Sequence, residues 1–379
     1  MPYLDHAAST PLLPEVTEVM VASMEGEYGN PSSIHAYGRR AKQVVEDARE
    51  KVAAAIGALS SEITFTGGGT EADNLALKGP FDLIPGRHVV VSAIEHSAVL
   101  DTAKSLELQG ATVSVVSVGP DGIVHPPDVA AAVTPSTVVV SVMAVNNEIG
   151  TVQPIAEIAA AVKAANPATL VHTDAVQALG NLPVDVHLWG LDLASFAAHK
   201  LGGPKGIGAL FVRSGVRLAP LIHGGGHERG LRSGTPNVAG IAGFGAAAEI
   251  AAKEVHAKGE ALIALRTELL DGIRRAVPDA IVNGDLTKRI PGNLNVSIPG
   301  TEGETLLMLL DQAGIACSSG SACASGALDP SHVLLAIGKD RALAAGSLRL
   351  SMGRATTAED VAAVLEVFPD IVGRARRAA

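Results

Sequence analysis

The feature that most constrains the fold is a regular alternation of short β-branched runs with longer helical stretches over residues 36–213. The runs expected as strands cover residues 63–65, 89–91, 112–116, 138–142, 170–172, 191–196 and 207–212. Short apolar strands separated by helices are typical of a mostly parallel sheet that is covered by helices on both faces. The sequence therefore predicts an α/β fold for this part of the chain.

The pattern changes after Gly240. A long Ala-rich helix is expected to run to about Arg275. The elements expected behind it are a strand at 294–298, a helix at 304–313, a strand at 348–351 and a terminal helix from residue 357. This order predicts a smaller α+β domain with the long helix as its connector. We assign residues 13–250 to a large domain, and residues 1–12 together with 251–379 to a small domain.

Charge narrows the class of partner. The chain of 379 residues has 29 Lys and Arg against 39 Asp and Glu, a formal charge of −10, and no block rich in basic residues. This balance disfavours direct nucleic-acid binding or an anionic membrane as the main partner. The N-terminus lacks the basic start and apolar run of a secretory signal, and two cysteines are too few for a disulfide framework. We expect a cytoplasmic protein.

A glycine-rich turn, Gly67-Gly-Gly-Thr70-Glu71, directly follows an expected strand and opens an expected helix. Glycines let backbone N–H groups approach an anion, and a helix N-terminus attracts negative charge. The segment is not a Walker loop, because no Gly-Lys-Ser/Thr follows. A phosphate site and a plain tight turn with Thr70 as the cap both fit this segment.

Two ionisable residues follow other strands, where ligands of α/β sheets bind. Lys200 lies in a glycine-rich loop after an apolar strand, and desolvation there would make its amine a nucleophile. The alternative is a lysine whose stem packs while its ammonium reaches water. Asp174 could keep a pyridine nitrogen protonated, or it could simply cap a helix.

Two further residues fit a ligand site. His96 follows the strand at 89–91 and could stack on a planar ring or move protons; the alternative is a histidine in a helix cap. Arg349 lies in an expected strand, where it could bind a carboxylate through two N–H groups. Its alternative is an outward-facing residue paired with an acid.

The two cysteines have different surroundings. Residues around Cys323 are small and lack periodicity, which predicts a mobile loop with an exposed, reactive thiol. Cys317 follows Ile315 and fits a buried strand residue. No metal site is expected, since only His332 adds a usual ligand nearby. A regulatory disulfide between the two cysteines remains an alternative.

Taken together, these motifs closely resemble the pyridoxal-phosphate-dependent cysteine desulfurases of the NifS/IscS type, in the subgroup with a long cysteine loop. The segments that carry the resemblance are residues 3–11, Gly29-Asn30-Pro-Ser-Ser33, Asn146-Asn147-Glu148-Ile-Gly150, residues 223–235, Ser318-Ser-Gly-Ser-Ala-Cys323 with Asp329-Pro-Ser-His332, and residues 349–353. The resemblance implies a fold-type I enzyme whose large, cofactor-binding domain has a seven-stranded sheet, and a small domain that carries the cysteine loop.

The resemblance also implies roles for single residues. Those implied to hold the cofactor ring are Lys200 (covalently), Asp174, Gln177, His96 and Asn147. Those implied to bind the phosphate are Gly69, Thr70 and His199, joined by Thr235 from the second subunit of a homodimer. Arg349, assisted by Asn30, would hold the substrate carboxylate. Lys200, helped by His96, would move the substrate proton, and Cys323 would accept the sulfur.

The implied reaction converts L-cysteine to L-alanine and leaves a persulfide on Cys323, whose sulfur passes to an iron–sulfur scaffold or a tRNA-thiolation enzyme. The alternatives are a selenocysteine lyase or an aminotransferase with the same cofactor, and a non-enzymatic sulfur-delivery protein. One position departs from the family pattern: Ala197 stands where many members have a phosphate-binding serine. The resemblance therefore does not carry that hydrogen bond over to this chain.

Overall fold

A seven-stranded sheet forms the larger part of the molecule, which we call the large domain. The structure is a computed structural model that describes residues 1–81, 83–319 and 330–378. The strand order is β1-β7-β6-β5-β4-β2-β3. The strands are β1 (Ile63–Thr66), β2 (His88–Ser92), β3 (Thr112–Val116), β4 (Thr137–Ser141), β5 (Leu170–Asp174), β6 (Leu193–Ala197) and β7 (Gly208–Val212). Only β7 runs antiparallel to its neighbours β6 and β1, so the expected mostly parallel sheet is confirmed.

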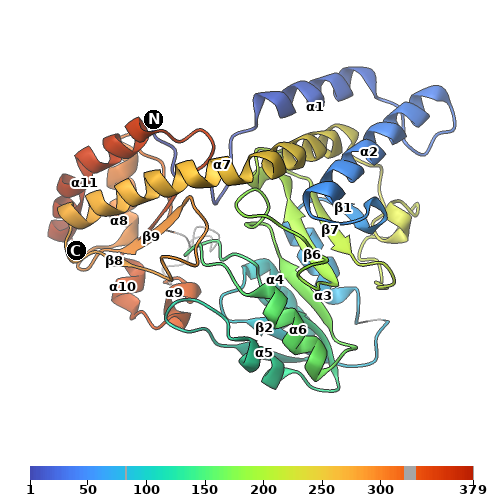
Figure 1. Ribbon diagram of the computed structural model, residues 1–379, viewed down its shortest axis with the longest axis horizontal. Coiled ribbons are helices and arrows are strands. Elements are labelled where there is room, and N and C mark those ends of the chain that lie inside the picture. The colour runs from blue at the N-terminus through green and yellow to red at the C-terminus, as the bar shows by residue number, and fades with distance from the viewer. Residues whose placement is uncertain (82, 320–329, 379) are drawn as a thin grey trace.

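Helices cover both faces of this sheet (Figure 1). They are α2 (Ala36–Ala55), α3 (Gly69–Lys78), α4 (Ser97–Glu107), α5 (Pro126–Ala132), α6 (Ile155–Ala165) and the first half of α7 (Val238–Ala276), and α1 (Pro14–Gly26) packs against α7. Neighbouring residues of β2 belong to different hydrophobic cores. Val90 packs in the core that contains residues of α2, α6 and α7, whereas Val89 and Val91 pack in the core that contains residues of α3 and α4. Burial on both faces explains why the central strands are continuous apolar runs rather than alternating ones.

The smaller part, which we call the small domain, has an antiparallel three-stranded sheet in the order β10-β9-β8. Its elements are β8 (Ile281–Val282), β9 (Asn293–Ser297), α8 (Gly303–Gln312), α9 (His332–Ala336), α10 (Arg341–Ala345), β10 (Ser347–Ser351) and α11 (Ala358–Ala378). The N-terminal residues join this sheet through bridges from Tyr3 to Ala316 and from Asp5 to Ser351. Figure 1 shows α7 running from the large domain to the small one.

The longer expected elements of both domains are present. The sequence did not predict α1, which has 13 residues, or α5, which has 7. It also did not predict α9, α10 and β8, which have five residues or fewer and are too short to show a period in the sequence. Within the described ranges, no helix combines the length and the apolar composition that crossing a bilayer requires.

Candidate active site

Lys200 lies where the sheet ends. It closes a short 3-10 turn (Ala198–Lys200) that directly follows β6. Its Nζ donates to the carbonyl oxygens of Ala7 at 2.6 Å and Ala8 at 2.8 Å. Gln177 Nε2 donates to the same Ala7 oxygen at 2.9 Å. The N-terminal segment therefore brings Lys200 and Gln177 together.

Asp174 is the last residue of β5, the strand next to β6. Its side chain is buried, and its Oδ1 accepts a hydrogen bond from Val176 N at 2.9 Å. Burial raises the pKa of this carboxyl, and the charges of His96 and Lys200 oppose that shift. The three predicted ring-binding residues thus lie near enough to interact electrostatically. They come from three different segments of the chain.

His96 is held by the helix that it begins. It is the N-cap of α4, and its Nδ1 accepts a hydrogen bond from Ala98 N at 3.1 Å. The alternative role that the sequence allowed for His96, a histidine in a helix cap, is therefore present. It does not exclude a ring-stacking role, because the cap uses only Nδ1 and fixes the plane of the imidazole at the edge of the site.

The glycine turn leaves room for an anion at the start of α3. A Cβ on Gly69 would lie 2.7 Å from Val176 Cγ2, so a side chain does not fit there. Thr70 and His199 line a pocket of about 700 Å³ that also contains Gly69, and Thr70 reaches a second pocket that His96 lines. Burial, followed by the nearby lysine charges, lowers the pKa of His199 to about 4, so its imidazole is neutral at pH 7.

A buried polar layer close to Asp174 was missed by sequence reasoning. His172 lies between Ser141 Oγ at 2.8 Å and Ser195 Oγ at 3.0 Å, and burial lowers its pKa to about 3. Burial raises the pKa of Glu95 to about 8, and it raises that of Asp73. Repulsion from Asp174 adds to both pKa increases, so the protonated forms of Asp73 and Glu95 are favoured. The only signal in the sequence was that these polar residues interrupt apolar segments.

Arg349 reaches the site from the small domain. It lies in β10 with 3% of its side chain exposed, and Nη1 donates to Asn147 O of the large domain at 3.0 Å. Its Nη2 forms an ion pair with Asp5 Oδ1 at 2.7 Å. Nε is buried and has no hydrogen-bond partner within the described part of the chain. An unsatisfied buried donor on a charged group is costly, and a ligand carboxylate would satisfy it.

Further contacts join the two domains beside Arg349. The Glu148 carbonyl oxygen accepts from Asn293 Nδ2 and Asn295 Nδ2, each at 3.2 Å. The Glu148 carboxylate accepts from Ser331 Oγ, and His332 Nε2 lies 3.0 Å from the Glu95 carbonyl oxygen. Residues of the Asn146-Asn147-Glu148 motif thus connect the sheet edge to the small domain.

Asn30 and Thr235 line a further pocket on this chain, and Thr235 also lines one with Gly67 of the glycine turn. Both are exposed and line one pocket together, and neither lines the pockets of Lys200, Thr70 or His96 described here. Asn30, which the resemblance pairs with Arg349, keeps that role as a prediction. Its Oδ1 accepts from Ser32 N at 2.9 Å, which shapes the local turn.

The cysteines can be compared only in part. Cys323 lies outside the described residues. Cys317 lies in the extended chain between the bridges of Ala316 and Ser318, half-buried against the small-domain core. Burial raises the pKa of its thiol to about 12, so Cys317 is protonated at neutral pH and a poor nucleophile.

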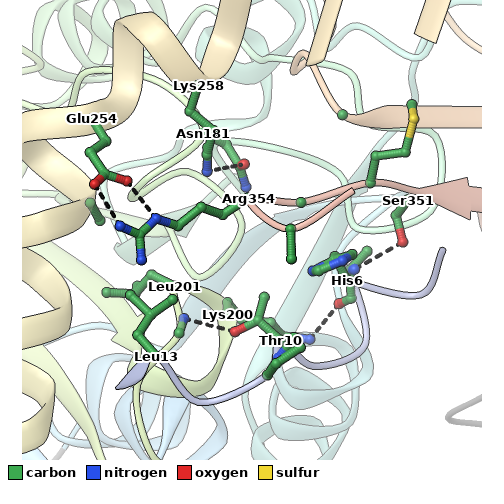
Figure 2. A pocket seen from close by; sticks show the side chains of 18 of the residues that line it. His6, Thr10, Leu13, Asn181, Lys200, Leu201, Glu254, Lys258, Ser351 and Arg354 are labelled. Atoms are coloured by element: carbon green, nitrogen blue, oxygen red, sulfur yellow. Dashed lines mark hydrogen bonds and ion pairs between the residues drawn. The ribbon is translucent and has the colours of Figure 1, made fainter. Parts of the chain in front are cut away.

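Lys200 also borders a pocket on the other side of the N-terminal segment, shown in Figure 2. This pocket of about 310 Å³ has largely apolar walls, and a double ion pair between Arg354 and Glu254 lies at one side of it. Ala7 and Thr10 line this pocket, whereas Ala8 and Ser9 line the pocket of Thr70 and His199. The N-terminal segment therefore separates the two cavities.

The donors at the sheet edge fit a planar, anionic pyridine aldehyde. One region has four features that suit this group: an amine that can condense with an aldehyde, a buried acid for a ring nitrogen, an imidazole, and a helix start without a side chain. The family model described as aminotransferase class-V matches residues 2–364 of this chain.

The chain belongs to the aminotransferase class-V family.

Its relatives make the assignment narrower. It is 47% identical over 378 residues to "Cysteine desulfurase IscS" of Clostridium botulinum, covering 99% of this chain and 95% of the relative. It is 46% identical to the protein of the same name from Methanosarcina thermophila, covering 99% and 92%. A solved structure described as a NifS-like protein is 40% identical with a TM-score of 0.93, covering 98% of this chain and 99% of the other. The resemblance to the NifS/IscS family is confirmed, and with it the pyridoxal-phosphate fold.

Proposed function

We propose that this protein is a pyridoxal-phosphate-dependent cysteine desulfurase that converts L-cysteine to L-alanine and transfers the sulfur to Cys323. The observation that carries the proposal is the convergence of Lys200 and Asp174 at one sheet edge with Arg349 from the other domain. A structure of "SspA in complex with cysteine", 35% identical with a TM-score of 0.83 over 94% of this chain, supports cysteine as the substrate.

The residues proposed to hold the cofactor divide along its length. Lys200 would hold it covalently, with Asp174 on the ring nitrogen, Gln177 on the ring oxygen, His96 on the ring face and Asn147 at the ring side. Gly69, Thr70, His199 and Thr235 of the partner subunit would bind the phosphate. When bound, pyridoxal phosphate supplies an electron sink for negative charge at the substrate Cα.

Each side chain then has a defined task. Asp174 keeps the proton on the ring nitrogen, because an ionised carboxylate in a buried setting favours a cation beside it. Lys200 Nζ moves the Cα proton, assisted by His96. Arg349 binds the substrate carboxylate and so fixes which bond faces the ring.

The sulfur step needs a thiolate. Cys323 Sγ would attack the substrate sulfur, forming an S–S bond as the substrate Cβ–S bond breaks. The electron pair of the broken bond stays with the carbon, which takes up a proton and leaves as alanine. Cysteine and the enzyme thiol thus give alanine and an enzyme persulfide without an external oxidant. The thiol of Cys317 is a poor candidate because its pKa is raised to about 12.

The finer features are proposed with the same reaction. We propose a homodimeric, cytoplasmic enzyme whose large domain spans residues 13–250, and whose persulfide passes to a protein acceptor such as an iron–sulfur scaffold or a tRNA-thiolation enzyme. Asn30 shares a pocket with Thr235. If Thr235 acts on the partner's cofactor, Asn30 would accompany it there. Mixing Lys200→Ala and Thr235→Ala subunits should then restore activity that neither variant has alone.

The decisive test compares the two cysteines in a single turnover with L-cysteine. In the presence of a thiol reductant, which releases sulfide from the persulfide, Cys323→Ala should form alanine and sulfide at less than about 1% of the wild-type rate, since nucleophilic catalysis is lost. Cys317→Ala is the matched control and should keep the wild-type rate. Unchanged sulfide release by Cys323→Ala would remove the mechanism and favour a lyase or an aminotransferase.

The colour of the purified protein tests the non-enzymatic alternative. A colourless protein that binds no pyridoxal phosphate would favour a non-enzymatic role, whereas a yellow protein whose visible absorbance is lost in Lys200→Ala would dismiss it.

A further inference from the structure

The N-terminal segment delivers one carboxylate to Arg349. Leu4 N donates to Ala316 O and Ser351 N donates to Leu4 O, each at 2.7 Å, so the segment lies as an extra strand beside the end of β10. This pairing fixes Asp5 opposite Ser351, two residues along the strand from Arg349. The position of Asp5 is therefore set by backbone pairing. It does not depend on the ion pair alone.

The guanidinium of Arg349 has two of its three nitrogens in use. Asp5 Oδ1 accepts from Nη2 at 2.7 Å and Asn147 O accepts from Nη1 at 3.0 Å. Asp5 is the one carboxylate within ion-pair distance of Arg349 among the residues that the structure describes. A nearly buried arginine needs such a counter-charge, because an unpaired buried charge is strongly destabilising.

The remaining nitrogen, Nε, is buried. Its N–H has no hydrogen-bond acceptor among the residues that the structure describes, whereas the opposite end of the planar group is held by a carbonyl of the other domain. A carboxylate can accept from Nε and from the second hydrogen of Nη2 in the bidentate arrangement that arginine favours. The contacts of Asp5 and Asn147 thus leave one edge of the fork for a ligand.

We propose that Asp5 is a positioning residue for substrate recognition: it holds the fork of Arg349 with the Nε edge toward the amino-acid carboxylate, and its negative charge limits how tightly that carboxylate binds. The inference rests on the proposed function, in which Arg349 binds the substrate. Weaker binding has a use here, because the product alanine carries the same carboxylate as cysteine and must leave. Asp5 belongs to the motif at residues 3–11, for which the sequence suggested no role.

Two substitutions separate charge from position. Asp5→Asn keeps an oxygen that can accept from Nη2 but removes the negative charge. Asp5→Ala removes both the charge and the acceptor. Relative to the wild type, Asp5→Asn should bind a ligand carboxylate about tenfold more tightly, because the repulsion between two nearby carboxylates is lost. Asp5→Ala should bind it at least about tenfold more weakly than Asp5→Asn, because the fork is no longer held.

The experiment titrates the holoenzyme with L-alanine, follows the visible band of the bound cofactor, and measures kcat and KM for L-cysteine separately. Asp311→Asn is the matched control: Asp311 is an exposed acid of the small domain that forms no ion pair with Arg349 among the residues that the structure describes, and the dissociation constant of this variant should stay within twofold of the wild type. The expected split is a lower alanine dissociation constant and a lower KM in Asp5→Asn, with Asp5→Ala weaker in both.

Two results would overturn the inference: a dissociation constant of Asp5→Asn within twofold of the wild type, or equal constants for Asp5→Asn and Asp5→Ala. A merely structural role would lower the melting temperature of both variants and leave these constants unchanged. Arg349→Lys separates this failure from that of the proposed function. If Arg349→Lys binds alanine as tightly as the wild type, the proposed role of Arg349 itself is wrong. If Arg349→Lys loses alanine binding while the Asp5 variants show no effect, only the proposed role of Asp5 is wrong.

Discussion

The two sides of the candidate site are built in different ways. On the large-domain side, Asp174 and Lys200 follow adjacent strands, so the sheet alone brings them to one edge. On the small-domain side, Arg349 is held by Asp5 and Asn147, which are 344 and 202 residues away in the chain. The first side depends on the core of one sheet. The second depends on contacts between domains, so it should be the side that substitutions adjust without loss of the cofactor.

The largest effect is expected at the large-domain side. Asp174→Ala should lower turnover of L-cysteine by about 10²–10³-fold, because the charge that we propose keeps the ring nitrogen protonated is lost. Steady-state alanine production measures it. Asp192→Asn is the control, since Asp192 also supports β5 but accepts from the backbone of Val171 at the other end of the strand. Comparable losses in both variants would show that the effect is only structural.

The next prediction concerns the buried layer beside Asp174. The pKa of Glu95 is raised to about 8 in the folded chain by burial, from 4.5 in the unfolded chain. Between pH 4.5 and pH 8 the folded state therefore holds a proton that the unfolded state has lost. The stabilisation of the folded state that comes from this proton is complete below pH 4.5 and is lost as pH rises through 8. Between pH 6 and pH 8 the free energy of unfolding of the wild type should fall by about 2 kcal/mol relative to that of Glu95→Gln. Urea unfolding at both pH values measures this, and a pH-independent difference would contradict a protonated Glu95.

A smaller effect is expected at the contact between the domains. Ser331→Ala removes the hydroxyl that donates to Glu148, and KM for L-cysteine should rise about threefold to tenfold while cofactor affinity stays unchanged. Thr357→Ala, at the start of α11, is a control that should change neither value. A loss of cofactor affinity in Ser331→Ala would break the comparison, because the two sides would then not be independent.

The smallest effect is expected at Ala197. Its Cβ lies 3.6 Å from where a Cβ on Gly69 would be, so a serine here would place a hydroxyl beside the glycine turn. Ala197→Ser should tighten pyridoxal phosphate binding about threefold to tenfold through one added hydrogen bond to the phosphate. Titration of the apoenzyme with the cofactor measures this. An unchanged affinity would mean that phosphate binding does not reach this position.

The same contrast explains what the sequence could predict. Asp174, Lys200 and Gly69 follow strands whose order along the sheet obeys simple rules, so their meeting at one edge was predictable. The ion pair of Asp5 and Arg349 was not, because it needs the N-terminal segment to pair with β10, and nothing local in residues 3–6 indicates that partner. Likewise His172 and Glu95 become notable only through burial, which depends on packing against other elements.

The central claim is that sulfur passes through Cys323 and that Cys317 takes no part. Tandem mass spectrometry of the wild-type protein after one turnover with L-cysteine tests it most directly. We expect the mass of one added sulfur atom on Cys323, removable by a thiol reductant, and an unmodified Cys317. Alanine formation with no added sulfur on Cys323, or with the sulfur on Cys317, would contradict it.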